Sequence, residues 1–128
     1  AVLAADDARR AALAGSATAG LRQSLSGRAL AVAVEEASRL RRLGEREEEE
    51  VLRRALVHWR QVAPGAGEAV LEVLSRQRLV TAHGPGPPWS TVLAQWQAQL
   101  AWSGRGWTVG DEFELPPDQW WTPPSPAA

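Results

Sequence analysis

Residues 27–63 read GRALAVAVEEASRLRRLGEREEEEVLRRALVHWRQVA and form the longest periodic stretch of the sequence. Arginines stand just before Gly44, at positions 39, 41 and 42, and glutamates stand just after it, at positions 45 and 47–50. A helix favours cations in its last turn and anions in its first, because its peptide dipoles are aligned. The charges therefore predict that one helix ends and another begins at Gly44, since glycine commonly ends helices.

Apolar residues recur every three or four positions on both sides of Gly44, as they do on one face of an amphipathic helix. These residues are Leu30, Val34, Ala37 and Leu40 before the glycine and Leu52, Ala55, Leu56, Trp59 and Val62 after it. We therefore predict an αα-hairpin with helices over residues 27–43 and 45–62. The alternative is one continuous helix that tolerates Gly44 at a cost of about 1 kcal/mol.

The remaining segments extend this prediction to a mainly α helical bundle. Residues 1–13 are rich in alanine and predict a short helix that ends at Gly15. Residues 68–80 and 89–102 carry apolar residues at helical spacing, and prolines and glycines separate the two segments. Gly110 and Asp111 form a dipeptide typical of two-residue turns, so residues 106–115 predict a small C-terminal β-hairpin.

Length and composition indicate one domain. The chain has 128 residues, of which 45% are hydrophobic and 23% are charged, values that are typical of globular proteins. We place this domain at residues 1–115. Residues 116–128 are rich in proline, with Trp120 and Trp121 between the prolines, and predict an extended tail.

Six amino-acid types are absent from the sequence: Cys, Ile, Lys, Met, Asn and Tyr. All of these except cysteine are encoded only by codons with A or T in the first two positions, so we infer a GC-rich bacterial genome. The absence of cysteine excludes disulfides and thiolate chemistry, and the absence of lysine excludes a P-loop or a Schiff base.

Charge and hydropathy do not favour binding to a membrane or insertion into one. The net charge is −1, so neither nucleic acid nor an anionic membrane surface is favoured. The longest apolar run, residues 29–34, is too short to span a bilayer, and the N-terminal residues lack the basic start of a signal peptide. We expect a cytoplasmic protein without a membrane partner.

The acidic run after Gly44 is the first candidate for chemistry. Glu45 with Glu48, and Glu47 with Glu50, have the i,i+3 spacing at which helix carboxylates can share a magnesium ion. This resembles the all-helical nucleotide pyrophosphatases, but their motif EExxE followed by ExxD is not matched. A solvated helix start is the preferred interpretation, and a metal-dependent nucleotide hydrolase is a distant alternative.

The two histidines, His58 and His83, have no metal-ligand spacing and no partner suited to nucleophilic catalysis. We therefore predict no catalytic residue, no metal and no cofactor, and we do not expect an enzyme.

The seven tryptophans suggest a protein interface. Trp89 and Trp96 have helical spacing and are expected in the core. Trp120 and Trp121 are adjacent in an extended segment, so their side chains point in opposite directions and cannot both pack on one surface. We predict that Trp107, Trp120 and Trp121 bind a protein partner or a second copy of the chain. The expected function is a non-catalytic interaction or assembly module with an apolar, Trp-rich face.

The order of predicted elements over residues 48–115 resembles a winged-helix domain, with residues 89–102 as the recognition helix and 106–115 as the wing. This resemblance implies the alternative function, a DNA-binding regulator. Its base and phosphate contacts would come from Ser90, Thr91, Gln95, Gln99 and Arg105. The long Pro/Gly connection before the recognition helix and the excess of acids after residue 64 depart from that pattern.

Overall fold

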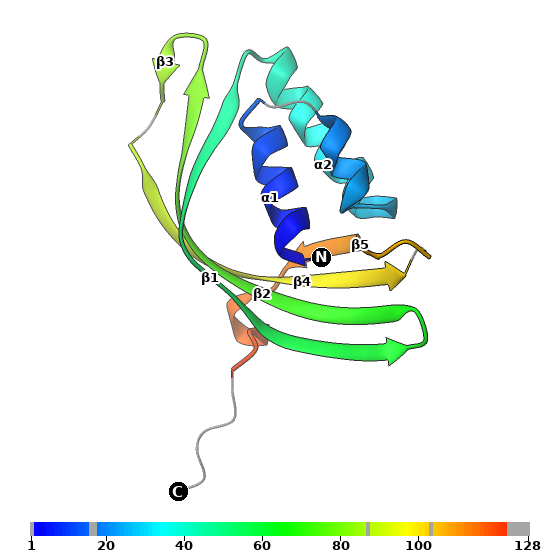
Figure 1. The fold of residues 1–128 in the computed structure, drawn as a ribbon. Helices are drawn as coiled ribbons and strands as arrows, with labels where there is room; N and C mark the ends of the chain where they lie inside the picture. The colour runs from blue at the N-terminus through cyan, green and yellow to red at the C-terminus, as the bar shows by residue number, and fades with distance from the viewer. Residues whose placement is uncertain (1, 16–17, 87, 103, 123–128) are drawn as a thin grey trace, which may run out of the picture.

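A computed structural model shows a strongly curved antiparallel sheet that wraps around two helices (Figure 1). The structure describes residues 2–15, 18–86, 88–102 and 104–122. Its elements, in order, are α1 (Val2–Leu13), η1 (Thr18–Gln23), α2 (Gly27–Arg42), β1 (Arg46–Ala63), β2 (Ala66–Thr81), β3 (Gly84–Pro85), β4 (Ser90–Trp102), β5 (Trp107–Glu114) and η2 (Pro117–Gln119). The protein is mostly β-sheet, and the predicted mainly α helical bundle is wrong.

The strands lie in the order β1-β2-β4-β5, and β3 pairs with the end of β2. The outer edge of β5 is covered by the segment before α2. There the Val109 N–H donates to the Ser24 carbonyl, and the Ser26 N–H donates to the Val109 carbonyl, each at 2.9 Å. The outer edge of β1 pairs with no other strand among the residues that the structure describes.

The break at Gly44 is present, and α2 ends there. Gly44 has φ +66°, its N–H donates to the Arg41 carbonyl at 3.1 Å, and the Glu45 N–H donates to the Leu40 carbonyl at 2.8 Å. These two bonds are those of a Schellman motif. The continuous-helix alternative is therefore wrong. The αα-hairpin is wrong as well, because the chain continues from Gly44 as strand β1.

Bulges in β1 explain why residues 45–62 resemble a helix. The register of β1 on β2 shifts between Val51 and Arg53 and again between Leu56 and His58. Each bulge adds one residue, so the period of two becomes three at that point. The residues paired with the helix-facing positions of β2 are consequently spaced by three and two: Val51, Arg54, Leu56, Trp59 and Gln61. Leu56 and Trp59 are therefore three apart on one face, as they would be on a helix, and the apolar residues at 52, 55 and 62 complete the apparent helical stripe.

The segments predicted as helices over residues 68–80 and 89–102 are strands β2 and β4. Strand β2 is buried on both faces at Val70 and Leu71, so apolar residues stand next to one another at 69–71 and 73–74, with Glu72 between them, and show no clear period of two. Strand β4 alternates strictly from Ala94 to Leu100, with glutamines on one face and apolar residues on the other. That alternation is the signature of a strand, and the prediction missed it.

The predicted β-hairpin over residues 106–115 is one continuous strand, β5. Val109 pairs with Leu100 and Asp111 pairs with Gln99, which leaves Gly110 as the extra residue of a bulge. With a strand in place of the recognition helix and no hairpin in place of the wing, the winged-helix resemblance is wrong.

The core lies between the concave face of the sheet and the two helices (Figure 1). The helices contribute mostly small residues, which allow them to approach the sheet closely, while the sheet contributes larger ones. Buried core residues of the helices are Val2, Ala5, Ala12, Ala33 and Ala37, and those of the sheet are Ala69, Leu71, Val73, Ala98, Leu100 and Val109.

Candidate interaction surface

Three tryptophans meet at the end of the sheet where the β1–β2 and β4–β5 connections lie. The ring of Trp107 is centred 5.8 Å from that of Trp59 and 5.7 Å from that of Trp102, and both pairs are edge-to-face. This arrangement is the preferred geometry of aromatic pairs. The three side chains, here named the tryptophan cluster, therefore hold one another in defined orientations.

An apolar hollow of about 300 Å³ lies beside the tryptophan cluster on the helix side of the sheet. The start of α1 supplies one wall through Val2 and Leu3, and the strands supply the rest. Three side chains that line the hollow are only half-buried: Leu3 is 44% exposed, Leu56 49% and Trp59 47%. Trp102, in the tryptophan cluster beside it, is 52% exposed. Large apolar groups are thus gathered on one surface and are open to solvent.

Two local features place Trp59 on this surface. The bulge between Leu56 and His58 brings Trp59 opposite Ala69, on the same face as Leu56, which is opposite Leu71. Gly67 then leaves room for the indole, because a Cβ there would lie 2.5 Å from Cη2 of Trp59.

A buried ion network fixes α1 against β1 behind the hollow. The carboxylate of Asp6, 1% exposed, accepts hydrogen bonds from Arg9 at 3.0 Å, Arg10 at 2.8 Å and Arg54 at 3.0 Å. Burial alone raises the pKa of Asp6, but the hydrogen bonds and charges of these three arginines outweigh it, so the pKa lies below its usual value. Arg54 also pairs with Asp7. Asp6 therefore links the helix to a strand 48 residues further along the chain.

A polar cavity of about 230 Å³ lies between the helices and the sheet, next to this network. Its arginines are already paired: Arg9 with Glu112 at 2.8 Å, and Arg10 with Glu49. Arg9 also lies over the ring of Trp96, 4.6 Å from its centre. The positive charges lining the cavity are thus balanced by neighbouring carboxylates.

Two carboxyls near this cavity have raised pKa values. Burial raises the pKa of Glu47, and the nearby charge of Glu36 raises it further. Burial also raises the pKa of Glu112, although Arg9 opposes this. Within the described residues, no group of three or more histidines and carboxylates has the arrangement of a metal site.

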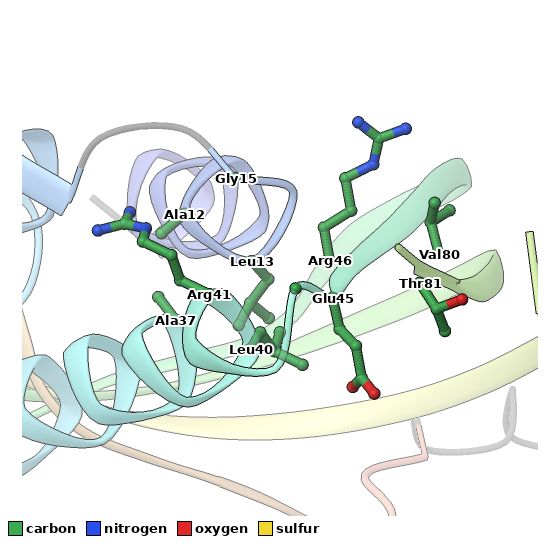
Figure 2. Close-up of a pocket in the computed structure, with 11 residues that line it drawn as sticks. Ala12, Leu13, Gly15, Ala37, Leu40, Arg41, Glu45, Arg46, Val80 and Thr81 are labelled. Atoms are coloured by element: carbon green, nitrogen blue, oxygen red, sulfur yellow. The ribbon is translucent and has the colours of Figure 1, made fainter. Parts of the chain in front are cut away.

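A larger open pocket, of about 410 Å³, lies where the ends of α1 and α2 meet the start of β1 (Figure 2). Its floor is apolar and includes Leu13, Ala37 and Leu40. Figure 2 shows the charged side chains of Arg41 and Arg46 extending away from each other. They do not converge on a common point, so the two arginines do not form a joint site for an anionic ligand.

The segment after β5 lies on the opposite, convex face of the sheet. The side-chain amide of Gln95 accepts a hydrogen bond from the Trp121 N–H at 2.7 Å and donates one to the Trp121 carbonyl at 2.9 Å. The ring of Trp121 lies 4.1 Å from that of His58, centre to centre. Trp120 is half-buried, and its Nε1 donates to the Leu115 carbonyl at 2.9 Å.

The three predicted partner-binding tryptophans therefore do not form one surface. Trp107 belongs to the tryptophan cluster on the helix side, whereas Trp120 and Trp121 lie on the convex face. Four residues of the helix-side surface were not predicted as partner contacts: Leu3, Leu56, Trp59 and Trp102. Leu56 and Trp59 are three apart in the sequence, and only the bulge between them puts both on that face. The prolines at 123, 124 and 126 of the predicted tail lie outside the described residues.

The residues predicted to contact DNA are spread along β4 and beyond it. Ser90 and Thr91 lie at its exposed start, Gln99 is exposed near its other end, and Arg105 lies in the connection to β5. Gln95 is 2% exposed, and its side-chain amide is hydrogen-bonded to Trp121 and Glu72. The structure does not bring these five residues together.

The acidic run and the histidines also differ from their predicted setting. On strand β1 the side chains of Glu47 and Glu50 point to opposite faces, so they cannot share a metal ion as on a helix. Glu48 and Glu50 instead pair with Arg78 and Arg76 across the strands. His83 is exposed in the turn between β2 and β3.

No protein-family model and no curated protein matches the sequence. Among solved structures, the chain is similar to the intermembrane space region of the chloroplast protein ARC6, with 15% sequence identity and a TM-score of 0.79 over 89% of this chain and 90% of that chain. At this identity the similarity shows a shared β-rich fold. In the part of the chain that the structure describes, every helix is too short or too polar to cross a membrane.

Proposed function

We propose that this chain is a non-catalytic interaction module that binds a protein partner, or a second copy of itself, through the tryptophan cluster and its apolar hollow. The observation that supports this proposal is the exposure of Leu3, Leu56 and Trp59 around one hollow, with the exposed Trp102 in the tryptophan cluster beside it. Contiguous exposed apolar surface of this kind marks interaction sites in soluble proteins.

The arrangement suits binding for two physical reasons. Each indole can bury roughly 150–250 Å² of apolar surface, so a few tryptophans supply much of the favourable free energy of an interface. Their edge-to-face packing and the close fit of Trp59 over Gly67 also limit their motion before binding. Less conformational entropy is then lost on association.

The hollow indicates how a partner would be held. It is lined by apolar side chains from α1, β1, β4 and β5, and its volume of about 300 Å³ is enough for one or two large apolar side chains of a partner. Trp59 and Trp107, which line the hollow, would flank the inserted group. Trp120 and Trp121 remain predicted contacts of a separate surface.

Sedimentation velocity over a range of concentrations, together with capture of partners from a bacterial lysate, tests this function. We expect the wild-type chain to self-associate or to retain a defined partner, and Trp102→Ser to lose that association while keeping its circular dichroism spectrum. Leu93→Ser is the matched control, since Leu93 is similarly exposed, at 43%, but lies on the convex face. Equal association by wild type and Trp102→Ser, or loss in the Leu93→Ser control alone, would contradict the proposal.

A further inference from the structure

The apolar hollow beside the tryptophan cluster is lined by the edge strand of the sheet. Leu56 and Trp59 of the hollow belong to β1, and the outer edge of β1 pairs with no other strand in the described part of the chain. Along such an edge, the backbone N–H and C=O groups that point away from the sheet can bind another strand. One partner can therefore contact both the hollow and the backbone of β1.

Strand β1 exposes more large apolar side chains than any other element that the structure describes. These side chains are Val51, Leu52, Leu56, Trp59 and Val62. Edge strands of soluble proteins are usually protected by charged residues, because an apolar edge is a template for pairing with another chain. The glutamates at 47–50 protect the first part of β1, and the exposed apolar residues begin directly after them.

The bulges of β1 limit the length of a strand that can be added to it. They leave two regular runs, residues 53–56 and 58–61, between positions where the register shifts. A bulge interrupts a ladder of hydrogen bonds, so a short extended segment can pair with one run more readily than a long strand can pair with all of β1. A second copy of β1 carries the same bulges, and both sets would fall in one ladder. A short segment of a different protein fits the edge better.

The run 53–56 presents different side chains on its two faces. Leu56 lies on the helix side and lines the hollow, whereas Arg53 is paired with Leu74 and lies on the convex side. Arg53 is exposed and has no ion-pair partner among the described residues. Residues opposite each other on neighbouring strands share a face. An added strand therefore places one side chain beside Leu56 at the hollow and another beside the positive charge of Arg53.

We infer that β1 binds an extended segment of a partner protein as an additional strand along residues 53–56. A large apolar side chain of that segment enters the hollow, and an acidic side chain three residues away faces Arg53. Main-chain hydrogen bonds give the affinity and the two side chains give the specificity, as in other cases of strand addition. This inference rests on the function proposed above and names the class of partner.

Peptide selection followed by backbone methylation tests the added strand. Short peptides are selected from a random phage-displayed library on the full-length wild-type chain, and the tightest binder is synthesised with a fluorescent label. We expect an apolar and an acidic residue three positions apart. Every second N–H of an added strand points to β1, so N-methylation of one alternate set of residues should abolish binding, while methylation of the other set should preserve it. Equal effects of the two methylation patterns would overturn the inference.

Two variants of the chain test the side-chain contacts with the same peptide. Leu56→Ser should weaken binding by at least ~10-fold, because it removes part of the hollow, whereas the control Leu93→Ser on the convex face should not. Arg53→Glu should bind a peptide with lysine in place of the acidic residue more tightly than the original peptide. Unchanged binding by both Leu56→Ser and Arg53→Glu would overturn the inference.

Amide hydrogen exchange, measured by NMR, separates this inference from the proposed function. An added strand should protect alternate amides of residues 53–56 that exchange rapidly in the free chain. A partner that inserts only side chains into the hollow would leave these amides unprotected, which would overturn strand addition and keep the proposed function. A library that yields no binder, with association still lost in Trp102→Ser, would have the same meaning. No peptide binding and no association of the wild type would contradict both.

Discussion

The indole of Trp59 lies over the backbone of Gly67 on the neighbouring strand, at a distance that leaves no room for a side chain. A Cβ on Gly67 would be 2.5 Å from Cη2 and 2.9 Å from Cζ3 of Trp59. Gly67 itself is buried and is paired with Gln61 of β1 and Leu100 of β4. The orientation of the Trp59 side chain therefore depends on the absence of a methyl group at position 67 of β2.

Gly67→Ala should displace Trp59 and lower the free energy of unfolding by about 1–3 kcal/mol, as overpacking does in tightly filled sites. Tryptophan fluorescence during urea unfolding measures both effects. In a Trp59→Ala background the same substitution should be neutral to slightly stabilising, because the clash is gone and alanine is preferred to glycine in a strand. Equal costs in both backgrounds would show that the two residues are not coupled.

Asp6→Asn should destabilise the protein by about 3 kcal/mol at neutral pH, because it leaves buried arginines without their shared carboxylate. Asp7→Asn is the control, since that side chain is 63% exposed and pairs with Arg54 at the surface, and it should cost less than about 1 kcal/mol. Urea unfolding of the three proteins gives the comparison. Similar losses in both variants would contradict the central role of Asp6.

The pKa of Asp6 is lowered in the folded protein, so its carboxylate contributes stability above the usual aspartate pKa of about 3.9. That contribution is lost as the pH falls below this value toward the lower folded pKa. The stability difference between wild type and Asp6→Asn should accordingly be constant near neutrality and should shrink below about pH 4. A difference that grows on acidification would contradict this sign.

Glu47→Gln should have the opposite pH dependence. Burial and Glu36 raise the pKa of Glu47 in the folded state, so its neutral form is favoured, and stability falls as the pH rises through that raised pKa. At pH 7 the variant should be more stable than the wild type by roughly 0.5 kcal/mol, the scale of an unfavourable like-charge pair. Below the usual glutamate pKa, about 4.3, the two should converge. Thermal unfolding at pH 7 and pH 3.5 measures this, with the exposed Glu35→Gln as control.

Gly44→Ala should cost about 1–2 kcal/mol, because alanine at φ +66° brings its Cβ close to the following carbonyl. No neighbouring group adds to this cost, since the nearest atom to a Cβ there would be the Cβ of Ala82 at 3.6 Å. Gly44→Asn should cost less, since asparagine tolerates the left-handed conformation better. Equal costs for the two substitutions in chemical denaturation would contradict the conformational explanation.

The sequence was informative where local interactions decide the structure. The alanine-rich start predicted α1, and the arginines before Gly44 predicted the end of α2. Both signals act within one or two helical turns. The alternation in β4 was also present in the sequence, but the apolar residues at 89, 93, 96 and 100 matched a helical period equally well.

Strand β1 could not be predicted in this way. Glutamate, arginine, leucine and alanine favour helices, and the bulges of β1 interrupt the period of two by which a strand is recognised. The pairing of β1 with β2, and the salt bridges of Glu48 to Arg78 and Glu50 to Arg76, outweigh this local preference. Propensities of a few tenths of a kcal/mol per residue are routinely overridden by such tertiary contacts.

The amino-acid sequence by itself determined the two helices and the end of α2 at Gly44, because these depend on neighbouring residues. Its composition, with seven tryptophans, also indicated an interaction surface. Only the tertiary structure decided that the chain after Gly44 is a sheet. It also decided that Trp59, Trp102 and Trp107 share one surface while Trp120 and Trp121 lie on the other. The reason is that strand register, and with it the face on which each side chain lies, is set by the paired strand and its bulges.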